Sequence, residues 1–122
     1  MAVQSYQDLI GWKKSMALVI DVYRSTKGFP KEELYGLTSQ IRRAAVSIPS
    51  NIAQGQGRLT RGEFRQFLGH ARGSVFELDS QVLIATELGY LSESELQRLR
   101  SKIQEVGRIL NGLLNSLSAS SN

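Results

Sequence analysis

The sequence contains no cysteine, one histidine and two prolines, and aromatic residues make up only 7% of its 122 residues. Without cysteine there can be no disulfide, thiolate zinc site or cysteine nucleophile. No stretch approaches the roughly 20 apolar residues of a membrane span, and Lys13 and Lys14 interrupt the first apolar region before it reaches the length of a signal-peptide core. We therefore expect a soluble cytoplasmic protein with no membrane association and no cofactor.

Apolar residues make up 41% of the chain, enough for one core built mainly of Leu, Ile, Val and Ala. No Pro, Gly or Ser run is long enough to be a linker, so residues 1–122 are expected to form a single domain. The apolar spacing predicts helices over about 6–26, 32–54, 61–88 and 93–117. Because the loops are short and no strand pattern is present, the predicted fold is all-α, an antiparallel up-down-up-down four-helix bundle.

Local signals mark the third and fourth helices most clearly. Thr60 with Glu63, and Ser92 with Glu95, form capping boxes at their starts, and Gly89 is expected to end the third helix. The apolar seam of the fourth helix alternates steps of three and four, and it consists of Leu96, Leu99, Ile103, Val106, Leu110, Leu113 and Leu117. The apolar stripe of the first helix consists of Leu9, Trp12, Met16, Val19 and Tyr23.

The third helix is apolar on more than one side. Its main stripe consists of Phe64, Leu68, Ala71, Val75, Leu78, Val82 and Ala85. Phe76, Leu83 and Ile84 lie off this stripe. A helix with two apolar sides usually packs against two partners. We expect one to be the bundle itself and the other a neighbouring subunit.

The second helix has two unlike sides. Its apolar seam consists of Leu34, Leu37, Ile41, Ala44, Ile48 and Ile52. A second strip, called the polar seam below, consists of Gln40, Arg43, Ser47, Asn51 and Gln54. Pro49 costs about 3 kcal/mol in an ordinary helix interior. One interpretation is a kinked helix with a polar flank, and the other is a seam that contacts another subunit or a polar ligand.

The formal net charge of +4 suggests an anionic partner. Arginines dominate the middle of the chain, where Glu63 is the single acid from residue 42 to 72; they are Arg42, Arg43, Arg58, Arg61, Arg65 and Arg72. The planar guanidinium suits phosphate or carboxylate. Nucleic-acid binding through these arginines is one hypothesis, and pairing with acids of the same or a neighbouring subunit is the other.

Little in the sequence indicates catalysis or a metal site. His70 falls almost opposite the core stripe of the third helix, without a ligand-type neighbour, and is expected to be a surface residue. Glu77 and Asp79 do not repeat on a second helix as in di-metal bundles. Gly55 and Gly57 precede a helix N-terminus where an anion could bind, but a loop that ends the second helix explains them better. The sequence therefore predicts no catalytic and no metal-binding residue.

Two runs of residues resemble the bacterial four-helix-bundle family of 23S rRNA intervening-sequence proteins. They consist of Gln40, Arg43, Ala44, Ala45, Ser47, Ile48, Asn51, Ile52, Ala53 and Gly55, and of Phe64, Phe67, Leu68, Ala71, Gly73, Ser74 and Glu77. The resemblance implies a homopentamer. It also implies kinship with the accessory variability proteins of diversity-generating retroelements, which bind nucleic acid and a partner reverse transcriptase. The family's usual NIAEG reads NIAQG here, so a carboxylate that could pair with Glu77 is replaced by Gln54, which argues against catalysis.

These observations together predict a non-enzymatic, oligomeric accessory protein that binds structured RNA or DNA through its arginines. The polar seam and Glu77 are candidate interface residues, and a reverse transcriptase is a candidate partner implied by the resemblance. The alternative is an oligomeric protein scaffold that binds no nucleic acid. Few aromatics are available to stack on single-stranded bases, so binding is expected to depend on shape and salt.

Overall fold

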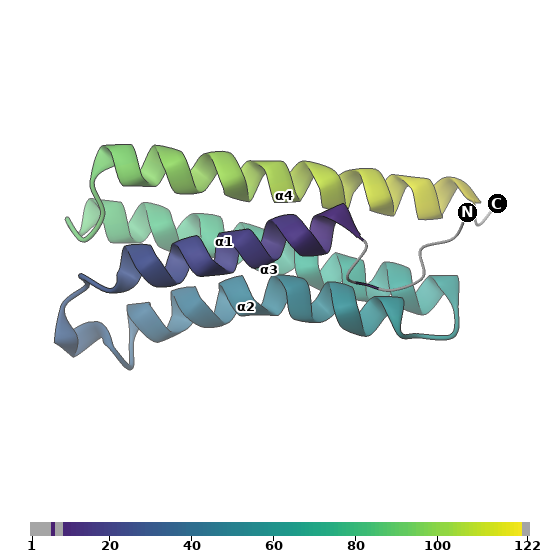
Figure 1. Ribbon diagram of the computed structural model, residues 1–122, viewed down its shortest axis with the longest axis horizontal. Coiled ribbons are helices and arrows are strands. Elements are labelled where there is room, and N and C mark those ends of the chain that lie inside the picture. Colours follow the sequence, from purple (N-terminus) through teal and green to yellow (C-terminus); the bar gives the residue numbers. More distant parts are fainter. Residues whose placement is uncertain (1–5, 7–8, 121–122) are drawn as a thin grey trace.

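The computed structural model describes Tyr6 and residues 9–120, with side chains described up to residue 117. These residues form the α-helices α1 (Ile10–Thr26), α2 (Leu37–Gln56), α3 (Arg61–Glu87) and α4 (Glu93–Ser120), and a short 3-10 helix, η2 (Lys31–Glu33), precedes α2. The four α-helices run side by side and successive ones point in opposite directions (Figure 1). No strand occurs in this part of the chain. The predicted all-α antiparallel bundle is confirmed.

Most of the core comes from the apolar seams that the sequence predicts for α2, α3 and α4, together with Leu18 and Val22 of α1. The prediction for Leu34 is wrong, because it precedes α2 and is 48% exposed. Ile41, Leu78 and Ile103 are at most 1% exposed, and each represents a seam of buried side chains on its helix. Burying one such side chain stabilises the fold by about 1.5 to 3 kcal/mol. The last residues of the α4 seam, Leu113 and Leu117, pack against the core while partly buried.

The apolar stripe predicted for α1 is wrong by about one residue. The residues that α1 buries are Gly11, Ser15, Leu18, Val22 and Thr26. Met16 and Tyr23, from the predicted stripe, are 38% and 40% exposed. Small residues at positions 11 and 15 explain the difference, because they let the backbone of α1 approach its neighbours. At Gly11 an added Cβ would lie 3.3 Å from Cγ2 of Ile109 on α4.

Two helix starts also differ from the prediction. α1 begins at Ile10 rather than near Tyr6, and residues 7–8 between them lie outside the described residues. The segment predicted as one helix over 32–54 is divided, because Gly36 has φ −112° and ψ −114° and separates η2 from α2. Glu33 uses this break to cap α2: its Oε1 accepts from the Leu37 N–H at 3.1 Å.

The second carboxylate oxygen of Glu33 links this segment to the turn between α3 and α4. The Tyr90 hydroxyl donates to Oε2 of Glu33 at 2.9 Å. This hydrogen bond is the main reason that the pKa of Tyr90 is raised above its ordinary value. The Glu33 side chain therefore connects the start of α2 with the turn between α3 and α4.

The predicted capping boxes and the glycine stop are confirmed. Oγ1 of Thr60 accepts from the Glu63 N–H at 3.1 Å, and Oγ of Ser92 accepts from the Glu95 N–H at 3.1 Å. Gly89 follows α3 with φ +82°, the left-handed conformation that glycine adopts without strain. The predicted end of α2 is right in part: Gly57 caps the helix, but α2 continues through Gly55 to Gln56.

Charged side chains join α4 to its two neighbours. On the α1 side, Asp21 pairs with Lys102 and, at 3.3 Å, with Arg98. Lys14 and Glu105 pair at 3.4 Å farther along the same contact. On the α3 side, Arg100 donates Nε to Oδ1 and an outer N–H to Oδ2 of Asp79, at 2.8 and 3.0 Å.

Candidate nucleic-acid interface

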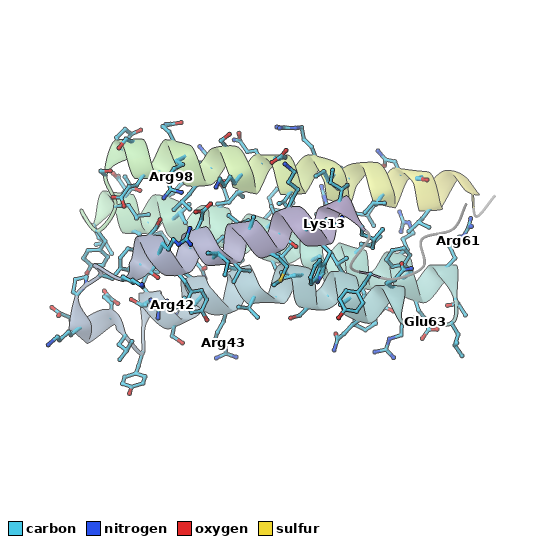
Figure 2. The ribbon with its side chains drawn as sticks, viewed as in Figure 1. Lys13, Arg42, Arg43, Arg61, Glu63 and Arg98 are labelled. Carbon is cyan, nitrogen blue, oxygen red and sulfur yellow. The ribbon has the colours of Figure 1, made fainter. Side chains whose placement is uncertain are left out.

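The six arginines highlighted by the sequence do not share one surface. Figure 2 shows Arg42 and Arg43 near the start of α2 and Arg61 at the far end of the bundle, where α3 begins. Arg42 and Arg43 are also separated by about 100° around the helix. Arg42 contacts α1 through Tyr23 and Thr26, whereas Arg43 lines a groove toward α3.

The largest arginine group lies along one side of α3. Arg61, Arg65 and Arg72 fall within about 40° of one another around that helix, on the side that borders α4. Arg108 of α4 lies across the groove from Arg72. We call these four residues the basic flank. All four are exposed, which is what contact with a large anion requires.

A groove of about 270 Å³ lies between α3 and α4 beside the basic flank. Gly107 forms part of its floor, and Arg72 and Arg108 line it together with Phe76. The guanidinium of Arg72 lies 4.9 Å above the Phe76 ring, and its Nε donates to Oδ1 of Asn111 at 2.7 Å. The ring is 57% exposed, so an aromatic face is present here that the sequence did not indicate.

The turn between α2 and α3 presents a second basic group. The guanidinium of Arg58 lies 4.6 Å above the ring of Phe67, which holds it against α3. Leu59 beside it is 99% exposed. Because α3 begins at Arg61, directly after this turn, the turn and the basic flank are continuous at this end of the bundle.

One described hydrogen bond, from Ser47, links the polar seam to α3. Asn51 donates Nδ2 to the carbonyl and to Oγ of Ser47, at 2.8 and 2.9 Å. Ser47 and Ser74 share a hydrogen bond of 2.8 Å, and Ser74 donates to the carbonyl of His70 at 3.2 Å. This chain of hydroxyl and amide groups crosses from α2 to α3, so this part of the seam functions inside the bundle.

The remainder of the polar seam stays open. Gln40, Arg43 and Ser47 line a groove of about 350 Å³ together with Glu77 of α3. Gln81, one turn beyond Glu77, is 6% exposed and donates a long hydrogen bond of 3.4 Å to Oε2 of Glu77. Gln54 is exposed near the end of α2. Opposite charges from the two helices, Arg43 and Glu77, thus line one accessible groove.

Gly55 has a packing role in addition to the predicted role of ending the second helix. A Cβ at this position would lie 2.8 Å from Cβ of Phe67 and 2.9 Å from Cδ1 of Phe64. The carbonyl oxygen of Phe64 would be 3.2 Å away. Only glycine lets α2 and α3 approach so closely at this end. The signal was present, because Gly55 continues the seam of Ile48 and Ile52 at a step of three.

The off-stripe apolar residues of α3 fall on two sides of the helix. Phe76 and Leu83 lie on the side of the basic flank, and Ile84 lies about 100° away, toward α2. Their exposed fractions are 57%, 37% and 49%. Leu88, 54% exposed, follows Ile84 on the second side. The molecule therefore offers two separate apolar contacts rather than one.

His70 is exposed, as the sequence predicted, with its ring 5.8 Å from that of Phe67. Among the residues that the structure describes, no group of three His, Asp or Glu side chains is arranged to hold a metal ion. Within the same residues, no helix is both long and apolar enough to cross a bilayer.

Comparison with known proteins assigns the fold to a family. A sequence model described as 23S rRNA-intervening sequence protein matches residues 7–112. The chain belongs to this family. The match includes all of α1, α2 and α3 and most of α4, so the polar seam and the basic flank both lie within the family's region.

One solved structure has a fold similar to that of this chain. It is a crystal structure of a protein of unknown function from the S23 ribosomal protein family of Bacteroides thetaiotaomicron. The two structures superpose with a TM-score of 0.81 at 18% sequence identity, covering 87% of this chain and 96% of the other. At that identity the likeness concerns the fold alone. No curated protein matches the sequence.

Proposed function

We propose that this intervening-sequence protein is a non-enzymatic accessory protein of the cytoplasm that binds structured RNA or DNA through its basic flank. The observation that carries the proposal is the alignment of Arg61, Arg65 and Arg72 beside a groove that also contains Arg108. From Arg61 to Arg72, α3 rises about 16 Å. Several consecutive phosphates of one strand fit along that length, because B-DNA rises about 3.4 Å per phosphate on each strand.

The contacts of Arg72 favour phosphate recognition over a merely solvated surface. A guanidinium carries five N–H donors, and the bond to Asn111 uses one of them. Contact with the Phe76 ring and Asn111 restricts the side chain before any ligand arrives. An arginine held in this way gives up less conformational entropy on binding a phosphate than a free lysine does.

The test is binding of a structured RNA and a DNA duplex as a function of salt. We expect the logarithm of affinity to fall linearly with the logarithm of salt concentration, because neutralised phosphates release counterions. Arg61→Gln with Arg65→Gln should weaken binding about tenfold and reduce the salt slope by about two. The matched control is Lys13→Gln with Arg24→Gln, which removes the same charge from exposed positions on α1.

The control variant should bind like the wild type. Two results contradict the proposal: binding that does not depend on salt, or no binding to either nucleic acid at low salt. Equal losses in the two double variants would also contradict it, because they would assign the effect to net charge rather than to the basic flank.

The proposal includes self-assembly, with the homopentamer implied by the family resemblance as the expected state. Ile84 and Leu88 support a contact on the α2 side of α3, beside the open groove of the polar seam. Assembly there leaves the basic flank exposed around a ring, so weak phosphate contacts would add up through multivalency. A retroelement reverse transcriptase is the protein partner that we propose on the same resemblance, and co-purification with the enzyme tests it.

The second candidate is an oligomeric protein scaffold that binds no nucleic acid, and the exposure of Phe76 and Leu83 favours it. Light scattering on two variants separates the candidates. Under the first, Ile84→Asp disrupts the oligomer, and Phe76→Asp preserves it while lowering RNA affinity. If Phe76→Asp disrupts the oligomer instead, the basic flank is covered by self-assembly and the scaffold is favoured.

A further inference from the structure

A small pocket lies at the opposite end of the bundle from the α2–α3 turn, where α1 ends and α2 begins. Its volume is about 150 Å³, and its cationic lining residues are Lys27, Lys31 and Arg42. Figure 2 labels Arg42 at this junction. The pocket belongs to the α1–α2 side of the molecule and shares no residue with the groove of the basic flank.

Arg42 is held in place before any ligand binds. Its Nε donates to Oγ1 of Thr26 at 2.9 Å, and that hydroxyl donates in turn to the carbonyl of Val22 at 2.9 Å. The guanidinium also lies 4.6 Å above the ring of Tyr23. Two contacts on different sides fix its plane, and a planar fork fixed in this way suits bidentate contact with an oxyanion.

The pocket wall contains a buried hydroxyl without a partner. Thr38 is 3% exposed, and its Oγ1 makes no hydrogen bond within the described structure. Leaving such a group unpaired costs about 1 to 3 kcal/mol, so native proteins rarely retain one without a reason. An oxyanion in the pocket, or a water bound to it, would supply the missing partner.

Backbone groups add to the attraction for an anion. Thr38 and the next residue are the second and third residues of α2, whose N–H groups have no partner within a helix. The helix dipole places partial positive charge at this end of a helix of 20 residues. The nearby acid Glu33 is occupied elsewhere, because its two oxygens accept from Leu37 and Tyr90, and it does not line the pocket.

We propose that this pocket binds a phosphomonoester. Arg42 donates hydrogen bonds to two of its oxygens, and Lys27 and Lys31 neutralise its charge. The Thr38 hydroxyl completes its hydrogen bonds. Three cations match a dianionic phosphate better than a carboxylate, which carries one charge. The phosphate can come from a free nucleotide or from the 5′ end of an RNA. Both sources present the same group to the same residues.

The first experiment is titration of the full chain with inorganic phosphate at pH 7.5, followed by amide NMR. The expected result is saturable shifts at residues 26–31 and 37–42. Thr38→Val keeps the side-chain shape and removes the hydroxyl, so the thermal midpoint should not fall while phosphate affinity drops about tenfold. Lys31→Gln should also weaken binding severalfold, and Lys13→Gln, a matched loss of one charge on α1, should not.

The second experiment distinguishes the two sources. AMP is compared with adenosine, and an RNA with a 5′ phosphate is compared with the same RNA ending in a 5′ hydroxyl. A preference for AMP over adenosine upholds the site with a mononucleotide ligand, and a preference for the phosphorylated RNA upholds it with an RNA end. The proposal is overturned if phosphate produces no saturable shifts, or if Thr38→Val and Lys31→Gln leave phosphate affinity unchanged.

Discussion

The contact between α2 and α3 and the contact between α1 and α4 hold the same bundle together by different means. Between α2 and α3, the hydroxyls of Ser47 and Ser74 share a hydrogen bond of 2.8 Å, and Gly55 brings the backbones close at one end. Between α1 and α4, Asp21 and Glu105 receive long cationic side chains. The first contact combines short polar side chains with a close approach of backbones. The second adds pairs of long charged side chains to the close approach of Gly11 to Ile109.

This difference determines what each contact tolerates. Short side chains cannot change conformation to make room, so an added methyl group in such a contact must move a whole helix. Long lysine and arginine side chains can adjust to a changed neighbour. The cations of these pairs are 42 to 45% exposed, so each pair contributes little. The α2–α3 contact is therefore the one that fixes the geometry of the polar seam.

The largest expected effect comes from filling the close approach at Gly55. Gly55→Ala places a Cβ within 2.8 Å of Phe67 and should lower the free energy of unfolding by about 2 kcal/mol. Gly73→Ala is the matched control, because nothing lies within 4 Å of its added Cβ and alanine favours a helix by about 1 kcal/mol. Urea denaturation should give changes of opposite sign. Equal changes would disprove the close approach.

A smaller effect is expected from the hydroxyl pair that links the two helices. Ser47→Ala removes the hydroxyl that bonds to Ser74 and accepts from Asn51, and should cost about 1 kcal/mol. The double variant, Ser47→Ala with Ser74→Ala, should be less destabilised than the sum of the single variants, because both polar groups disappear together. A double-mutant cycle measures this coupling. Additive losses would mean that the two hydroxyls act independently.

The smallest effect is expected from the charged contact. Asp21→Asn removes the acid shared by Lys102 and Arg98, and the loss in unfolding free energy should stay below about 1 kcal/mol. The difference from wild type should shrink in 1 M NaCl, since salt screens charges over about 3 Å at that concentration. The Ser47–Ser74 coupling should keep its value in the same salt. A salt-insensitive Asp21 effect would contradict the distinction between the two contacts.

The sequence predicted the α3–α4 half of the molecule well because its signals are local. A capping box needs only four residues, as at Thr60 and Ser92. A heptad seam repeats the same spacing several times, so each repeat supports the prediction of a helix. The face of α1 was mispredicted because both of its sides are apolar and its partners are distant in the chain. The small residues Gly11 and Ser15 decide which side is buried, because they allow close packing against other helices. A hydrophobicity scale does not include this steric effect.

The candidate site was predictable in residue type and less so in arrangement. The residue types of α2 indicated a polar seam, but Ser74, its partner on α3, follows only from the register between helices. Arg42 and Arg43 are neighbours in sequence and serve different sides of the molecule. The orphaned hydroxyl of Thr38 could not be found without the fold, because burial and lack of a partner are properties of the whole structure.

Arginines stacked on rings change what the net charge means. Arg42, Arg58 and Arg72 each lie within 4.9 Å of an aromatic centroid. An unrestrained arginine or lysine loses up to about 2 kcal/mol of rotamer freedom when it is immobilised. Here part of that loss has already occurred on folding. The formal charge of +4 does not reflect this ordering, and replacing these arginines by lysine would keep the charge while losing the ordering.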